Sequence, residues 1–213
     1  MFSCKFSRSP DNESMTKIIL LSLLVSFSSF ASVVGISSHP LNEEAKVLSA
    51  EMTGYMSERN EMGMGLRYTQ EVSRYRIMDL TASGAQDSRG LTMGAGVDFE
   101  LLSEDISQPR FSLKPYVQYQ KFEGASSNLV GLAPMLRKGF SINGQEFFPY
   151  LALPSGIKID STTDEFVYYA SMSFGASMPF PGANEKLLLS LEGNKNMGAS
   201  SDYIGCLVSW VWN

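Results

Sequence analysis

From residue 47 onward, apolar and polar residues alternate one by one over long stretches of the chain. The clearest stretch is 91–101. Its odd-numbered residues are apolar, and all of them except Ala95 are large, while its even-numbered residues are polar or glycine. Successive side chains of a strand point to opposite faces, so this pattern predicts strands with one apolar and one polar face. Similar alternation occurs at 62–69, 111–120, 166–177, 187–194 and 203–212, and more weakly at 47–56, 74–83, 129–139 and 147–158. We expect eight to ten strands, with ten as the best count.

The predicted strands are long. Many of them run ten residues or more, whereas strands of soluble proteins usually have about five or six residues. A tilted strand needs about 9–11 residues to cross a bilayer. A sheet embedded in lipid must close on itself, because an open edge would leave backbone groups unpaired. The sequence therefore predicts an all-β protein, a closed antiparallel up-and-down transmembrane β-barrel.

Alternation alone does not say which face is outside, but side-chain size does. The polar face combines single charges with many small residues, namely Gly63, Gly65, Gly94, Gly96, Ser171, Ser173 and Gly175. The lumen of a narrow barrel has room for small residues and a few charged ones. A polar face that met water would instead be richer in Lys and Glu than this one is. The apolar face is large and carries aromatic residues near the strand ends, as lipid-facing girdles do. We expect the apolar face to meet lipid, and a soluble β-barrel or sandwich is the alternative.

The N-terminal region has the pattern of a secretory signal peptide. Residues 18–30 are apolar and uncharged, Lys17 precedes them, and small residues precede Ser32 at the two positions that a signal peptidase reads. The apolar run is shorter than the roughly 20 residues of a membrane-spanning helix. We expect cleavage between Ala31 and Ser32, and translation that starts at Met1 or at Met15.

These patterns divide the chain into a leader with a cleavable signal peptide (1–31), an N-terminal arm (32–46) and a barrel domain (47–213). The formal net charge is −5, which disfavours nucleic acid as a partner. Of the two cysteines, Cys4 is removed with the leader, and Cys206 is left without an internal disulfide partner.

The last predicted strand carries a family resemblance. Its alternating residues Ile204, Cys206, Val208, Trp210 and Trp212 resemble the C-terminal strand of Gram-negative outer-membrane proteins, which the barrel assembly machinery recognises. This chain ends one residue later, at Asn213, where that family usually ends on Phe. With the signal peptide and the size, the pattern is similar to small barrels of the OmpA-transmembrane, OmpX and YfaZ-like kind, and to accessory colonisation factor A. The resemblance implies a cell outer membrane location, with membrane lipid or lipopolysaccharide as a partner.

The charged residues of the polar face are the candidate site. They are Glu51, Arg67, Asp98, Glu100, Lys114, Arg137 and Glu192. A small barrel has a lumen just wide enough for side chains to fill, and an unpaired buried charge is unfavourable. We expect these residues to pair across the lumen rather than to line a conducting pore. We also expect bulges at Pro115 and Pro134, because proline cannot donate a hydrogen bond to the ladder.

We predict no catalytic residue, metal site or cofactor. The single histidine, His39, lies on the predicted N-terminal arm, whereas outer-membrane enzymes use a histidine that activates a hydroxyl or water near the outer leaflet. The favoured function is a structural or surface-interaction role, such as envelope integrity, adhesion or colonisation, with a host or envelope surface as a possible ligand. A narrow pore or transporter for small solutes is the alternative, and a lipid-modifying enzyme is a third class.

Overall fold

The computed structural model describes residues 41, 45–56, 62–73, 75–85, 90–122, 125–161, 165–180, 186–197 and 202–212. The predicted signal peptide, its cleavage site at Ala31 and Ser32, and His39 lie outside these residues. Asn213 also lies outside them.

Every regular element of the described residues is a strand. The strands are β1 (Lys46–Met56), β2 (Met62–Ser73), β3 (Arg76–Ala85), β4 (Gly90–Leu102), β5 (Arg110–Phe122), β6 (Ala125–Arg137), β7 (Phe140–Ile142), β8 (Gln145–Ala152), β9 (Ser155–Asp160), β10 (Phe166–Pro179), β11 (Leu187–Asn196) and β12 (Asp202–Trp212). In the described part of the chain, no helix is long and apolar enough to cross a membrane.

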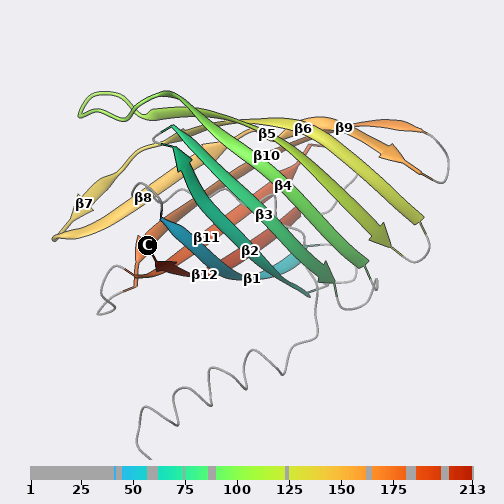
Figure 1. Cartoon of the computed structure of the whole chain (residues 1–213), viewed down its shortest axis with the longest axis horizontal. Coiled ribbons are helices and arrows are strands. Elements are labelled where there is room, and N and C mark those ends of the chain that lie inside the picture. The colour runs from blue at the N-terminus through green and yellow to red at the C-terminus, as the bar shows by residue number, and fades with distance from the viewer. Residues whose placement is uncertain are drawn as a thin grey trace, which may run out of the picture.

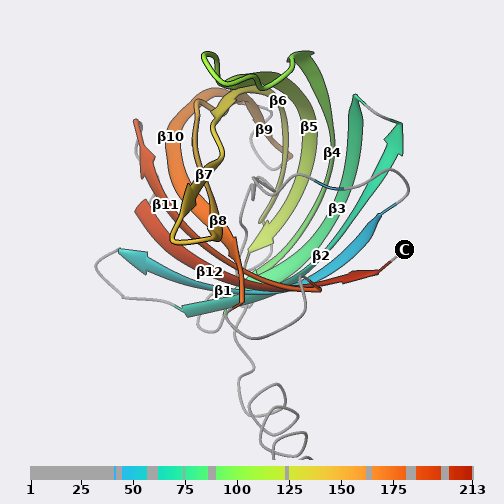
Figure 2. The same cartoon turned by 90° about the vertical axis from the view of Figure 1, so that its left-hand side faces the viewer.

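The strands form a ring of antiparallel pairs (Figure 2), in which β1 to β6 and β9 to β12 each follow one another in chain order, while β6 pairs with β8 and β9 and not with β7. The ring closes where β1 pairs with β12 along its whole length, from Lys46 opposite Trp212 to Met56 opposite Asp202. The strands are strongly inclined within the wall (Figure 1). The predicted closed antiparallel barrel is confirmed. The start of β1, at Lys46, and the end of β12, at Trp212, lie at the same end of the ring, which we call the terminal end.

The wall contains ten strands, because β8 and β9 occupy one position in it. Both lie between β6 and β10, and both keep the same register with each neighbour. The interruption falls at Pro154, which has no N–H to give to the ladder. Backbone bonds continue on either side of it, from Leu153 N–H to the Pro134 carbonyl (3.0 Å) and from Ser171 N–H to the Pro154 carbonyl (2.8 Å). The best count of ten strands is therefore confirmed.

The strand β7 was not predicted. It pairs only with the start of β8, and this hairpin projects past the wall at the terminal end (Figure 1). Its turn contains Asn143 (φ 53°) and Gly144 (φ 78°), the residue types that adopt two consecutive positive φ angles in a tight hairpin.

Neither predicted proline bulge changes the register of the β5–β6 ladder. Pro115 lies opposite Leu132 and Pro134 opposite Leu113, in one unbroken register. Register shifts occur elsewhere, between Glu71 and Ser73 and between Glu100 and Leu102. Both prolines lie on the outward face of the wall.

The two faces of the wall point as predicted. Large apolar side chains are exposed on the outside, among them Leu48, Leu66, Leu80, Val117, Val130 and Trp210. Small polar side chains are buried inside, among them Ser49, Thr53, Thr69, Ser112 and Ser173. An exposed apolar exterior around a buried polar interior is the pattern of a lipid-embedded barrel and the inverse of a soluble one.

Two glycines allow the backbones of β6 and β9 to come close together. Gly156 lies opposite Gly131, and a Cβ atom added at Gly156 would lie 2.4 Å from the Val130 carbonyl oxygen and 2.8 Å from the Gly131 Cα. Both contacts are with backbone, so no side-chain movement can relieve them.

We therefore expect Gly156→Ala to destabilise the folded barrel by roughly 1–3 kcal/mol, as overpacking usually does. The matched control is Gly54→Ala, where the nearest atom to an added Cβ is 4.0 Å away; alanine should be neutral or favourable by about 0.5–1 kcal/mol there. Urea unfolding in lipid vesicles, read from the fraction that migrates as folded barrel on unboiled gels, measures both variants. Equal stability of the two variants would contradict the close approach.

Candidate functional site: the lumen charge network

All seven predicted lumen charges point to the inside of the barrel. Six of them are buried, and Glu100 is half-buried near the terminal end. They come from β1, β2, β4, β5, β6 and β11, where their even or odd position in the alternation puts them on the small, polar face. We call these residues and their direct partners the lumen charge network.

The central pair is Glu51 with Arg67. A guanidinium nitrogen of Arg67 lies 2.6 Å from a carboxylate oxygen of Glu51, and the two side chains are 1% and 2% exposed. They come from the neighbouring strands β1 and β2, where Glu51 lies opposite Gly65. Water is excluded from both charges, so each depends on the other for neutralisation.

A second pair joins Lys114 on β5 to Asp79 on β3, with 2.5 Å between the ammonium nitrogen and a carboxylate oxygen. The intervening strand β4 presents Gly96 between them. A Cβ atom at Gly96 would lie 2.6 Å from the Lys114 Cε and 3.3 Å from the Asp79 carboxylate. Lys114 therefore lies flat against the wall, across Gly96, and ties together two strands that are not neighbours.

The third group is centred on Glu192 of β11. Its carboxylate accepts hydrogen bonds from the hydroxyls of Tyr150 on β8 and Tyr203 on β12, the latter at 2.8 Å. Tyr150 reaches Glu192 across β10 at Gly175, where an added Cβ would lie 2.7 Å from the Tyr150 ring. This is the same arrangement as at Gly96: a long side chain crosses one strand over a glycine.

The fourth group lies toward the terminal end of the lumen. Arg110 contacts Glu100 at 2.8 Å and Asp98 at 3.6 Å, so two carboxylates of β4 share one guanidinium of β5. Arg137 lies opposite Arg110 in the β5–β6 ladder. It is 4% exposed, and its Nε and one terminal nitrogen have no hydrogen-bond partner among the described residues. Arg137 is thus the member of the network whose charge is least compensated.

The structure differs from the prediction in how the charges pair. We expected pairs across the lumen, but each pair lies along the wall, between strands that are neighbours or next-nearest neighbours. The reason is that glycines on the inner face leave space beside the wall, so long side chains need not extend into the centre. The sequence analysis also missed Asp79, Arg110, Tyr150 and Tyr203. All four lie in or next to predicted strands at inward positions, so following the alternation through every predicted strand could have found them.

Smaller polar groups complete the inner face. The Ser49 and Ser209 hydroxyls lie 2.8 Å apart across the closing β1–β12 pair, and the Asn194 amide donates to the hydroxyls of Ser171 (3.2 Å) and Ser173 (2.7 Å) on β10. Among the described residues, no group of three or more His, Cys, Asp and Glu side chains is arranged to hold a metal ion. Not every buried polar group of the inner face has a partner: besides Arg137, the hydroxyls of Thr53, Ser112 and Tyr116 have no hydrogen-bond partner among the described residues.

The predicted C-terminal assembly strand is β12. Its residues Ile204, Cys206, Val208, Trp210 and Trp212 lie on the outward face, while Tyr203, Leu207 and Ser209 are buried inside. The ring of Trp212 lies 6.4 Å from that of Tyr68 on β2. Both are at the terminal end, where aromatic side chains suit a membrane interface. The thiol of Cys206 is free and belongs to this apolar outer face.

We expect Arg67→Met to lower the free energy of unfolding by about 3–5 kcal/mol, because it leaves the Glu51 carboxylate buried without its partner. The matched change Arg137→Met should leave stability unchanged or raise it, because that guanidinium has no ion pair to lose. Unfolding in urea, followed by tryptophan fluorescence in detergent micelles, compares the two variants. Similar losses in both would show that Arg67 and Arg137 are held in equivalent ways, against the geometry described above.

No model of a known protein family matches the chain, and no curated protein matches it. Solved structures with a similar architecture include an outer membrane channel from Pseudomonas putida F1, with a TM-score of 0.47 and 10% identity over 85% of this chain and 100% of that one. Another is LpxR from Salmonella typhimurium, with a TM-score of 0.43 and 10% identity over 93% of this chain and 94% of that one. A third is Ail, the attachment invasion locus protein of Yersinia pestis, with a TM-score of 0.30 and 14% identity over 80% of this chain and 100% of that one. The likeness is one of overall architecture and assigns no role.

Proposed function

We propose that the chain is an outer-membrane barrel whose lumen is closed by its own side chains, and that it acts as a structural or surface-interaction protein. The apolar exterior supports the membrane part of the proposal, because exposed side chains such as Leu66 (57%), Val130 (54%) and Trp210 (54%) would be unfavourable in water. The closing strand supports export to the outer membrane, since its alternating apolar residues face outward as those of assembly signals do.

The observation that carries the closed lumen is the exclusion of water from the Glu51–Arg67 pair. Its side chains are 2% and 1% exposed although they lie at the middle of their strands and point inward. Thr53, Thr69, Ser171 and Ser173 on the same inner face are equally inaccessible. A water-filled pore would leave its lining charges wet, as in the larger porin barrels. A filled lumen instead favours a protein that works through its outer wall and its loops.

The proposed orientation places the terminal end in the periplasm, as an even number of strands and a periplasmic N-terminus require. The opposite end then faces outward, with its short turns near lipopolysaccharide, host surfaces or other envelope components. The barrel assembly machinery is the proposed partner of β12. Membership of the OmpA-transmembrane, OmpX or YfaZ-like group, or kinship with accessory colonisation factor A, stays a prediction from the sequence pattern.

Two other functions remain alternatives of lower rank. A narrow pore or transporter would need the lumen charge network to open. A lipid-modifying enzyme would need a general base, and the one histidine of the sequence, His39, precedes the first strand of the barrel in the sequence. We therefore propose a protein without enzymatic activity, and His39→Ala should leave its function intact.

Conductance in planar lipid bilayers tests the closed lumen. The wild-type protein should show no discrete channel openings. The double variant Glu51→Ala with Arg67→Ala should show them, because it removes both long side chains of the buried central pair while leaving neither charge without its partner. The matched control is Ser190→Ala on β11, which changes a half-buried hydroxyl away from the central pair. Reproducible unit openings in the wild type would replace this proposal with the pore.

Cell fractionation tests the location separately. The folded protein should be recovered with the outer membrane and should migrate anomalously on gels until it is boiled, because a closed barrel resists detergent. Recovery in the soluble periplasm, without such a shift, would contradict the membrane assignment itself.

A further inference from the structure

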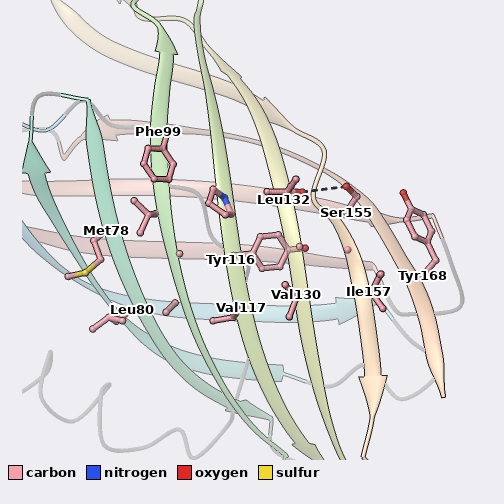
Figure 3. A pocket seen from close by; sticks show the side chains of 16 residues that line it. Met78, Leu80, Phe99, Tyr116, Val117, Val130, Leu132, Ser155, Ile157 and Tyr168 are labelled. Carbon is pink, nitrogen blue, oxygen red and sulfur yellow. Dashed lines mark hydrogen bonds between the residues drawn. The ribbon is translucent and has the colours of Figure 1, made fainter. Parts of the chain in front are cut away.

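The outer wall carries a shallow groove of about 750 Å³ that runs across β3, β4, β5, β6, β9 and β10 (Figure 3). One side is formed by the outward residues Leu80, Ala95, Val117, Val130, Ile157 and Tyr168, which follow one another in the ladder. The other side is formed by Met78, Val97, Pro115, Leu132 and Ser155. Its volume lies within the range of about 300–1,000 Å³ that is typical of ligand sites.

The groove follows from the residues of the inner face between its two sides. Gly96, Tyr116, Gly131 and Gly156 succeed one another in register across β4, β5, β6 and β9, and they form the floor. The three glycines hold the strands close, as the short contacts at Gly131 and Gly156 show. On the outside, the small side chains of Ala95, Pro115 and Ser155 leave the hollow open.

The lining is almost entirely hydrocarbon. Its side-chain polar groups are the hydroxyls of Ser155, Tyr116 and Tyr168, of which Ser155 donates to the Leu132 carbonyl at 3.4 Å and Tyr116 belongs to the inner face. The groove opens outward, within the apolar band of the wall. An extended hydrocarbon chain therefore suits its shape, its chemistry and its position.

A cation stands next to the groove. Arg76 is exposed on the outward face of β3 at the terminal end, opposite Phe99 in the ladder. Its guanidinium carbon lies 5.8 Å from the centre of the Phe99 ring, and Phe99 lines the groove. Guanidinium groups bind phosphate oxygens with two parallel hydrogen bonds. The terminal end thus places a phosphate-binding group beside one end of the hydrocarbon groove.

We propose that this groove binds one phospholipid, with an acyl chain in the groove and the phosphate held by Arg76. The inference rests on the proposed function, which puts the terminal end in the periplasm and hence Arg76 at the leaflet that contains phospholipid. A smaller groove of about 500 Å³ lies alongside and shares Ala95, Val117 and Val130 with the first. It offers space for the second acyl chain of the same lipid.

Native mass spectrometry of the protein, extracted from membranes in mild detergent and then mixed with phosphatidylglycerol, tests the site. Ala95→Phe places a ring where the two grooves meet, on the outward face, so the lumen is unaffected. Its control is Ala176→Phe, an outward position on β10 that lines neither groove. Arg76→Gln removes the cation, and its control is Lys186→Gln, an exposed cation at the same end of the barrel.

The wild type and both controls should carry one phosphatidylglycerol. Ala95→Phe and Arg76→Gln should each lower its occupancy about tenfold, the loss expected for one charge-assisted contact or a filled site. Equal lipid occupancy in all five proteins would overturn the inference. So would wild-type dimers that Ala95→Phe dissociates, because the groove would then bind a second copy of the chain. Heat-modifiable migration on gels shows whether each variant still folds as a barrel. A wild type that is not a membrane barrel would refute the proposed function. A folded, membrane-inserted wild type without bound lipid would refute only the lipid site.

Discussion

The pairing of β1 with β12 is the constraint on which the rest of the structure depends. Lipid offers no hydrogen bonds, so a sheet can cross it only when every strand has a partner on both sides. The pairing from Lys46–Trp212 to Met56–Asp202 provides the last partner. Once the ring closes, the inner face becomes a confined space of fixed width, and the outer face becomes a continuous apolar surface. The lumen charge network and the outer groove are consequences of that division.

Confinement explains how the charges are arranged. In a small barrel, charges cannot be solvated by bulk water, and each needs a partner within reach. The structure meets this need along the wall. Lys114 crosses Gly96 to reach Asp79, and Tyr150 crosses Gly175 to reach Glu192. Each contact bridges strands that are not neighbours, so the network reinforces the wall.

The inner glycines also link the two faces of the wall. Gly96, Gly131 and Gly156 leave room inside for Lys114 and Tyr116 and bring strands together. The same row forms the floor of the outer groove. A larger residue at Gly96 or Gly131 would collide with the side chain of Lys114 or Tyr116. The packing of Lys114 and Tyr116 on the inner face and the floor of the outer groove therefore involve the same glycines.

The sequence by itself determined the fold class, the ten strands of the wall and the face that each side chain takes, because alternation with period two is a local property of the backbone. It also placed Glu51, Arg67, Lys114 and Glu192 inside, and the residues of the closing strand from Ile204 to Trp212 outside. Only the tertiary structure decided which charges meet, since Lys114 and Asp79 lie far apart in the chain and come together through the strand order and register. It likewise decided that Arg137 has no ion-pair partner among the described residues, and that a row of glycines from three strands hollows the outer wall.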